Sequence, residues 1–273
     1  MPTTTHDGVN LYYEQHGDAG DPLLCIMGLG ATLQFWQFQT PVFARSHRVC
    51  VFDNRGMGRS DKPAGPYTTA AMAEDALAVM DACGFERAHV LGLSMGGMIA
   101  QELALRHPDR LQTLTLACTF AKPDEEAKAQ AAHSPFNPSQ PSTVDPIQLF
   151  KFMMSLVLTP EFIVREREWL RSLRETTMAS FSMDGFSAQY MAVMGHDTSS
   201  RLQALALPTL IMTGTADQLV PPRGSDELAR LIPDATLVKF ENGSHGFNVE
   251  QADKFNRAVL DFVAKHPLSD SRF

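Results

Sequence analysis

The feature that most constrains the fold is a short apolar run that ends in the pattern Gly-x-Ser-x-Gly and continues into a helix-like segment. The apolar run covers residues 88–93, the serine is Ser94, and helical periodicity continues to about His107. A strand of four to eight apolar residues, a turn of small residues and a helix fit this pattern. In that context the pattern predicts a sharp strand-to-helix turn that lifts the serine hydroxyl clear of a sheet.

The two glycines of this turn have a steric explanation. A serine in a sparsely populated backbone conformation brings its neighbours two residues away into close contact, so we expect Gly92 and Gly96 to be positions where no Cβ fits. The first N–H groups of the following helix, that of Met95 foremost, would then point without partners at any negative charge beside Ser94. A Gly/Ser-rich turn is often only a turn, and the partner residues discussed below are what favour a nucleophile here.

Other buried strands and helices alternate on both sides of this segment. Strands are expected at residues 9–16, 22–27, 47–52, 111–118, 208–214 and 236–240. Helices are expected at residues 35–45, 69–83, 225–231 and 251–265. Strands that alternate with helices at this spacing predict an α/β fold, with a mostly parallel central sheet and helices on both faces.

The alternation stops between residues 120 and 201. This stretch contains no buried-strand pattern, but it has helical segments rich in Met and Phe and a link rich in Pro and Ser at 133–141. We therefore predict a core made of residues 1–119 and 202–273, with a helical cap inserted at 120–201 over the carboxyl ends of the strands. Met and aromatic stripes at helical spacing are usually a helix bundle's own core, but together they also suit an adaptable apolar pocket.

Composition excludes several classes of function. The net charge is −8, and Lys and Arg form no run, so neither nucleic acid nor an anionic membrane is expected as the main partner. The N-terminus lacks the basic and apolar regions of a signal peptide, and no apolar stretch is long enough for a membrane helix, so we expect a cytoplasmic protein. The four cysteines, at positions 25, 50, 83 and 118, form no C-x-x-C pair. We expect four small, buried, reduced side chains and no metal site.

A serine hydroxyl is a poor nucleophile until a base takes its proton, so Ser94 needs a histidine that is held by an acid. The carboxyl ends of parallel strands converge on one edge of a sheet, where these partners should lie. Asp217 is in the loop after the strand at 208–214, and His245 is in the loop after the strand at 236–240. The chain order Ser94, Asp217, His245 is the one expected for this architecture, and we predict a catalytic triad.

Other residues compete for two of these roles. Nine histidines are present, but only His245 lies in a small-residue loop after a core strand. Asp217 has a simpler explanation as an aspartate that stabilises a turn, and Asp124, after the strand at 111–118, is the alternative acid. His196 and Asp197, where the insertion rejoins the core, could face a substrate or stabilise a turn, and we favour the turn.

A negatively charged oxygen that forms beside Ser94 needs two hydrogen-bond donors. The N–H of Met95 is the first. The turn at residues 28–30 follows the strand at 22–27, and the backbone N–H of Leu29 is the second donor that we predict.

Taken together, five segments make the chain similar to the α/β-hydrolase superfamily over its whole length apart from the insertion. They are Gly28-Leu29-Gly30, Asp53-Asn54-Arg55-Gly56-Met57-Gly58-Arg59-Ser60, Gly92-Leu93-Ser94-Met95-Gly96-Gly97, Gly214-Thr215-Ala216-Asp217 and Gly243-Ser244-His245. The chain most resembles the branch with small carboxylesterases, enol-lactonases, cofactor-free haloperoxidase-like perhydrolases and carbon–carbon bond hydrolases. In such relatives the segment at 53–55 is a structural turn near the site, and we expect the same here. Many of them have His-Gly where this chain has Met27-Gly28, which removes a side chain from the pocket entrance.

The sequence therefore predicts a serine hydrolase that needs no cofactor and cleaves carboxylic esters of small to medium apolar substrates through an acyl-enzyme. The triad is Ser94, Asp217 and His245, and the oxyanion donors are the amides of Leu29 and Met95. The same fold leaves two alternatives: a lactonase or carbon–carbon bond hydrolase on the same triad, and a receptor that binds its ligand without turnover.

Overall fold

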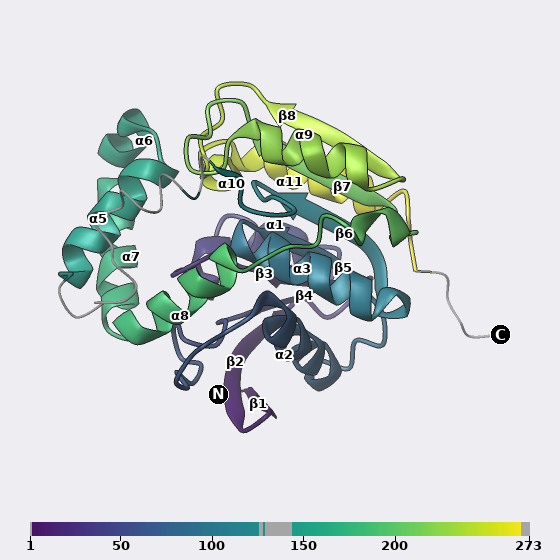
Figure 1. Ribbon diagram of the computed structural model, residues 1–273, viewed down its shortest axis with the longest axis horizontal. Coiled ribbons are helices and arrows are strands. Elements are labelled where there is room, and N and C mark those ends of the chain that lie inside the picture. Colours follow the sequence, from purple (N-terminus) through teal and green to yellow (C-terminus); the bar gives the residue numbers. More distant parts are fainter. Residues whose placement is uncertain (1, 126–127, 129–143, 269–273) are drawn as a thin grey trace.

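The structure is a computed structural model that describes residues 2–125, 128 and 144–268 (Figure 1). Within these residues eight strands form one sheet, in the order β1-β2-β4-β3-β5-β6-β7-β8. The pairs β1–β2 and β2–β4 are antiparallel, and the other five pairs are parallel. The predicted α/β fold with a mostly parallel sheet is confirmed.

The elements follow one another along the chain as the alternation predicts. The strands are β1 (Thr3–His6), β2 (Val9–His16), β3 (Pro22–Ile26), β4 (Arg48–Phe52), β5 (Ala88–Leu93), β6 (Leu111–Ala117), β7 (Thr209–Gly214) and β8 (Ala235–Phe240). The helices are α1 (Thr40–Phe43), α2 (Thr69–Ala82), α3 (Met95–Arg106), α5 (Pro146–Val157), α6 (Pro160–Arg165), α7 (Arg167–Met178), α8 (Met183–Met194), α9 (Pro222–Leu231), α10 (Phe247–Glu250) and α11 (Ala252–Val263).

The prediction of one helix at residues 35–45 is wrong. The structure has a short 3-10 helix at Leu33–Trp36 and then α1, which is four residues long. Pro41 explains the interruption, because it has no N–H to donate to the preceding turn and is tolerated only near the start of a helix. Strand β1 was not predicted either, since its sequence, Thr-Thr-Thr-His, has no apolar alternation.

Two apolar layers cover the two faces of the sheet. On one face α2, α3 and α9 pack over alternate strand residues, such as Leu24 of β3 and Val90 of β5. On the other face α1 and α11 pack over the intervening residues, such as Leu23 and Leu91. Because successive side chains of a strand point to opposite faces, strands buried on both faces are apolar throughout, as the sequence pattern indicates.

Helices α5 to α8, which we call the helical insertion (residues 146–194), lie between β6 and β7 in the sequence. In Figure 1 they stand together on the left, beyond one end of the sheet. The link at 133–141 lies outside the described residues. The boundaries at 120 and 201, and the role of the helical insertion as a cap, remain predictions.

The cysteines depart in one respect from the expected pattern. Cys25, Cys50 and Cys118 are buried, but Cys83 is partly exposed, and its sulfur lies 3.1 Å from that of Cys50. The two are 33 positions apart in sequence, so spacing alone gave no sign of this contact. None of the described helices is long and apolar enough to cross a membrane.

Candidate active site

The strand order places two turns against each other at one end of the sheet. β4 lies on one side of β3 and β5 lies on the other, so the chain reverses its direction of winding between β3 and β5. Ligands of open α/β sheets bind at the carboxyl ends of the strands at such a point. The turn after β3 touches the turn after β5, because a Cβ added to Gly28 would lie 3.0 Å from the Cβ of Ser94.

Ser94 occupies the strained conformation that the sequence predicts. Its φ is 57° and its ψ is −121°, values that residues other than glycine rarely adopt. A Cβ added to Gly92 would overlap the carbonyl oxygen of Gly96, and one added to Gly96 would overlap that of Ile26. The tight packing of these backbones fixes the turn, and the Ser94 N–H donates to the Ala117 carbonyl at 2.9 Å.

The loops after β7 and β8 bring an acid and a base together. The Nδ1 of His245 lies 2.8 Å from the Oδ2 of Asp217, and both side chains are buried. The Oδ1 of Asp217 accepts hydrogen bonds from the N–H groups of Leu219 and Val220, at 2.9 and 2.8 Å. The carboxylate is therefore held on both oxygens, and it orients the imidazole.

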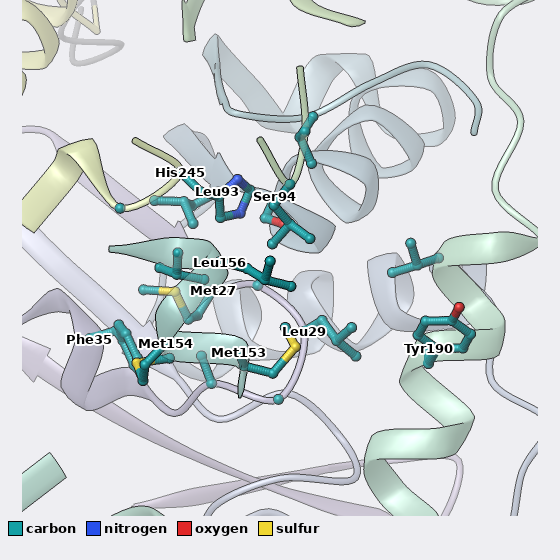
Figure 2. Close-up of a pocket in the computed structure, with 18 of the residues that line it drawn as sticks. Met27, Leu29, Phe35, Leu93, Ser94, Met153, Met154, Leu156, Tyr190 and His245 are labelled. Carbon is teal, nitrogen blue, oxygen red and sulfur yellow. The ribbon is translucent and has the colours of Figure 1, made fainter. Parts of the chain in front are cut away.

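Ser94 lies beside this pair of residues. Figure 2 shows the His245 ring and the Ser94 hydroxyl beside each other at one end of a pocket. Ser94, Asp217 and His245 all line this pocket. The structure thus brings together the three residues that the sequence proposed as a triad.

The competing residues lie elsewhere. Asp124 is an exposed side chain whose carboxylate lies 2.6 Å from Arg223, and it does not line the pocket. His196 is buried against Thr69, with 2.9 Å between its Nδ1 and the threonine hydroxyl. Asp197 accepts from the N–H of Ser199 at 3.0 Å, which is the turn-stabilising contact that we favoured.

Burial and charge act in opposite directions on His245. Burial is the largest single influence and disfavours the imidazolium, but the Asp217 carboxylate and the Cys118 thiol together outweigh burial and raise the pKa of His245 well above its ordinary value. The ring therefore holds a proton readily while Asp217 is charged, as a base that accepts a proton from a serine must.

Cys118 is the neighbour of the triad that the sequence analysis missed. It follows β6 directly, is fully buried and has a φ of 42°. Burial raises the pKa of its thiol, although contact with His245 acts against this shift. The available signal was its position, because β6 and β7 are neighbours and the residue after β6 must lie near the loop that carries Asp217.

Cys118, Asp217 and His245 each offer one side-chain atom that could bind a metal ion, and these three atoms lie within 4.8 Å of one another. It is the only group of three such residues, in the part of the chain that the structure describes, with the spacing of a metal site. Two ligands of one zinc ion, each roughly 2.1 Å from it, stand more than about 3 Å apart. The 2.8 Å between Asp217 and His245 is a direct hydrogen bond, so we interpret the group as an acid–base pair with a thiol beside it.

Two backbone N–H groups next to Ser94 are available as donors. Neither Leu29 nor Met95 donates its N–H to any residue in the described ranges. Met95 is the first residue of α3, whose amino-terminal N–H groups have no partner within the helix. The next amide, that of Gly30, is already occupied, because it donates to the Oε1 of Gln189 at 2.9 Å.

The pocket has a volume of about 860 Å³ and largely apolar walls. Met27, Leu29 and Leu93 line it from the ends of β3 and β5, and the helical insertion contributes residues such as Met153 and Tyr190 (Figure 2). No Lys or Arg is among the described residues that line it. Away from His245, a bound anionic group would therefore find no cationic side chain there, and burying an unpaired charge is costly.

Comparisons with known proteins agree with this architecture. A family model described as the alpha/beta hydrolase fold matches residues 21–252. The protein of Azorhizobium caulinodans that is provisionally named carbamate hydrolase RutD is 33% identical, over 97% of this chain and 99% of its own length. The 3-oxoadipate enol-lactonase 2 of Acinetobacter baylyi is 33% identical over 94% of each chain. The solved enol-lactonase of Burkholderia xenovorans superposes with a TM-score of 0.88 at 28% identity, over 96% of this chain and 100% of that one.

Proposed function

The chain belongs to the alpha/beta hydrolase fold family, and from that premise we propose that it is a serine hydrolase that cleaves carboxylic esters of small to medium apolar substrates through an acyl-enzyme. One observation carries the proposal. Ser94 and the hydrogen-bonded pair of Asp217 and His245 line a single pocket whose remaining walls are largely apolar.

In the first half of the reaction, Ser94 Oγ attacks the acyl carbon while the Nε2 of His245 takes its proton. The Nδ1–H of His245 donates to Asp217, which fixes the ring and stabilises its charged form. The carbonyl oxygen becomes an oxyanion between the N–H groups of Leu29 and Met95, and each such donor typically lowers the barrier by about 3–4 kcal/mol. His245 then gives its proton to the leaving alcohol.

In the second half, water repeats the same steps. His245 takes a proton from a water molecule, which attacks the acyl carbon, and the proton passes to Ser94 as the acid leaves. Every proton in this cycle moves between protein, substrate and water, so the cycle uses no metal or cofactor.

The pocket supports an uncharged, apolar substrate. Its walls bury an acyl or alcohol chain, and the absence of Lys and Arg from its described lining disfavours a carboxylate on the buried part. A butyryl ester is therefore expected to be a much better substrate than the succinyl half-ester of the same alcohol, which differs chiefly by an anionic group.

A lactone is the second candidate substrate, favoured by the enol-lactonase names of two relatives. A lactone is a cyclic ester and passes through the same tetrahedral intermediates. Carbamates enter the comparison because of the carbamate-hydrolase name of another relative. Carbon–carbon bond cleavage and binding without turnover are the remaining outcomes of the test.

The deciding experiment measures hydrolysis of p-nitrophenyl esters from acetate to laurate, with a lactone and a carbamate panel alongside. Wild type is compared with Ser94→Ala and with Ser172→Ala, an exposed serine on α7, as the matched control. We expect ester turnover by wild type and Ser172→Ala, with a loss of at least about 10³-fold in Ser94→Ala. The chain-length optimum then measures the usable depth of the pocket.

Full activity in Ser94→Ala would overturn the mechanism. Turnover that is confined to lactones or to carbamates would keep the triad and replace the substrate class. Labelling of Ser94 by a fluorophosphonate without turnover of any substrate would favour a carbon–carbon hydrolase or a receptor.

A further inference from the structure

Gln189 is a buried polar side chain on α8 that bridges two turns beside the pocket. It has no exposed surface. Its Oε1 accepts the N–H of Gly30, in the turn after β3, at 2.9 Å, and its Nε2 donates to the carbonyl of Arg55, in the turn after β4, at 2.7 Å. The N–H of Gly30 can only donate and the carbonyl oxygen of Arg55 can only accept. These two partners therefore fix which way the side-chain amide of Gln189 is turned.

The backbone of α8 is pressed against both turns, so Gln189 has little freedom to move. A Cβ added to Gly185 would overlap the carbonyl oxygen of Gly56, which brings the start of α8 into backbone contact with the turn after β4. A Cβ added to Gly30 would lie 2.7 Å from the ring of Phe186, the next residue of α8. One helix of the insertion therefore contacts the turn that carries Leu29 through both packing and hydrogen bonding.

We propose that Gln189 is the positioning residue that sets the orientation of the Leu29 amide for the oxyanion. The inference rests on the proposed function, since it presupposes an oxyanion at Ser94. The hydrogen bond to Gly30 fixes the peptide plane between residues 29 and 30, which adjoins the plane that carries the proposed Leu29 donor.

The other side of the same turn is held by the core. The Nδ2 of Asn54 donates to the carbonyl of Met27 at 2.8 Å. Asn54 thus fixes the residue before Gly28 and Gln189 fixes the residue after Leu29. A turn held at only one side can rotate its peptide planes, and a displacement of well under 1 Å is enough to weaken an oxyanion donor.

The test compares two substitutions at this position. Gln189→Met removes both hydrogen bonds at nearly constant volume and should lower kcat on the best ester by about 10- to 100-fold, with KM changed by less than about threefold. Gln189→Glu keeps an acceptor for Gly30 but supplies a donor for Arg55 only while it is protonated. Burial raises the pKa of such a carboxyl, so the ratio of the kcat of this variant to that of wild type should be highest at acid pH and fall as the pH rises.

A transition-state mimic gives an independent readout. Ser94 Oγ adds to the boron of phenylboronic acid, its proton passes to His245, and the tetrahedral anion that forms places an oxygen at the oxyanion donors. Gln189→Met should weaken this inhibitor by the same factor as it lowers kcat. Met191→Ala, an exposed position on the same helix, is the control and should change neither value.

The outcomes separate the two proposals. If wild type neither cleaves esters nor binds the boronic acid at Ser94, the proposed function fails and this inference fails with it. If wild type is active but Gln189→Met keeps its kcat within twofold, or loses kcat with no change in boronic acid affinity, the inference alone is overturned. Equal loss in the Met and Glu variants at every pH would indicate a steric role and would also overturn it.

A wild-type measurement covers the case in which neither variant folds. The Gly30 N–H lies in a turn, where amides normally exchange quickly, but its bond to a fully buried side chain should slow hydrogen exchange by several orders of magnitude. Exchange at the rate of an exposed turn would contradict the positioning role.

Discussion

His245 and Asp217 determine, at the scale of single residues, how the site responds to pH. The proposed mechanism needs the neutral imidazole, and burial alone would favour that form. The Asp217 carboxylate, with a contribution from Cys118, outweighs burial and raises the pKa of His245 well above 6.5. The ring therefore stays protonated, and the enzyme inactive, to a higher pH than an isolated histidine would allow.

We predict that kcat/KM rises with pH through a midpoint above 6.5. Asp217→Asn should move this midpoint down, because it removes the charge that favours the imidazolium, and should lower kcat by about 10³- to 10⁴-fold, because it disturbs the tautomer of the ring. The measurement is a pH profile of kcat/KM for both enzymes. Asp124→Asn, which changes an exposed aspartate outside the pocket, is the matched control. Superimposable profiles for wild type and Asp217→Asn would contradict this role of Asp217.

At the scale of elements, α8 connects the helical insertion to the core through backbone contact. Gly185 touches Gly56 so closely that a methyl group on Gly185 would displace the helix. Phe186 and Tyr190, which line the pocket, are on the same helix and would move with it.

We therefore expect Gly185→Ala to raise KM for long acyl esters and to lower kcat for all of them, because it moves both a pocket wall and Gln189. Gly195→Ala is the comparison at the other end of the same helix, where an added Cβ meets only the Met191 carbonyl at 3.3 Å. Steady-state kinetics on acetate and octanoate esters measure both effects. Identical parameters in the two variants would indicate that the close contact does not hold α8 in place.

Local pattern was sufficient for most of the core. The strands follow either an apolar run, as in β3, or an alternation of apolar and polar residues, as in β2, and apart from β1 their predicted bounds are within one residue of those found. The prediction of a helix at 35–45 failed because the apolar periodicity was given more weight than Pro41. Proline has no N–H and cannot stand in the interior of a regular helix. The helices α2 and α3 were found because no proline interrupts them.

The residues of the candidate site also divide into those that the local sequence pattern indicates and those that only the fold reveals. The sequence could single out Ser94, Asp217 and His245 as the proposed triad because each follows a strand and their chain order is characteristic. Gln189 was missed because its partners are 159 and 134 positions away, so no pattern near it in the sequence points to them. A glutamine within a largely apolar helical segment was the one available sign, and such a residue, if buried, must find partners that only the fold supplies.

At the scale of the whole molecule, two buried histidines link stability to acid pH. His89 lies in β5 and His196 lies where the helical insertion returns to the core, and burial lowers the pKa of each to about 4. In the unfolded chain both take up protons near pH 6.5. Below that pH the unfolded state therefore binds more protons than the folded state, and the free energy of unfolding falls until the folded rings titrate near pH 4.

We predict that the free energy of unfolding declines from about pH 6.5 towards pH 4, with a slope that approaches roughly 2.7 kcal/mol per pH unit if both rings contribute fully. Urea unfolding at a series of pH values measures the slope. His196→Gln should remove about half of it, because glutamine keeps polar atoms beside Thr69 and does not titrate in this range. His16→Gln, at a partly exposed position, is the control. A slope that is unchanged in His196→Gln would show that this ring already binds its proton in the folded state.

The position of the helical insertion has a consequence for how such a protein can diversify. It leaves the core after β6 and returns before β7, and these strands are hydrogen-bonded neighbours. The chain before the insertion also meets the chain after it, because the Thr198 N–H donates to the Ala121 carbonyl at 2.9 Å. One set of helices can therefore be exchanged for another without changing the strand order. An exchange must preserve two hydrogen bonds between the helical insertion and the candidate site. In one, the Gly30 N–H donates to Gln189, and in the other, the N–H of Gly246, beside His245, donates to the Val157 carbonyl. Substrate range can then evolve through the rest of the insertion while the nucleophile, acid and base stay in place.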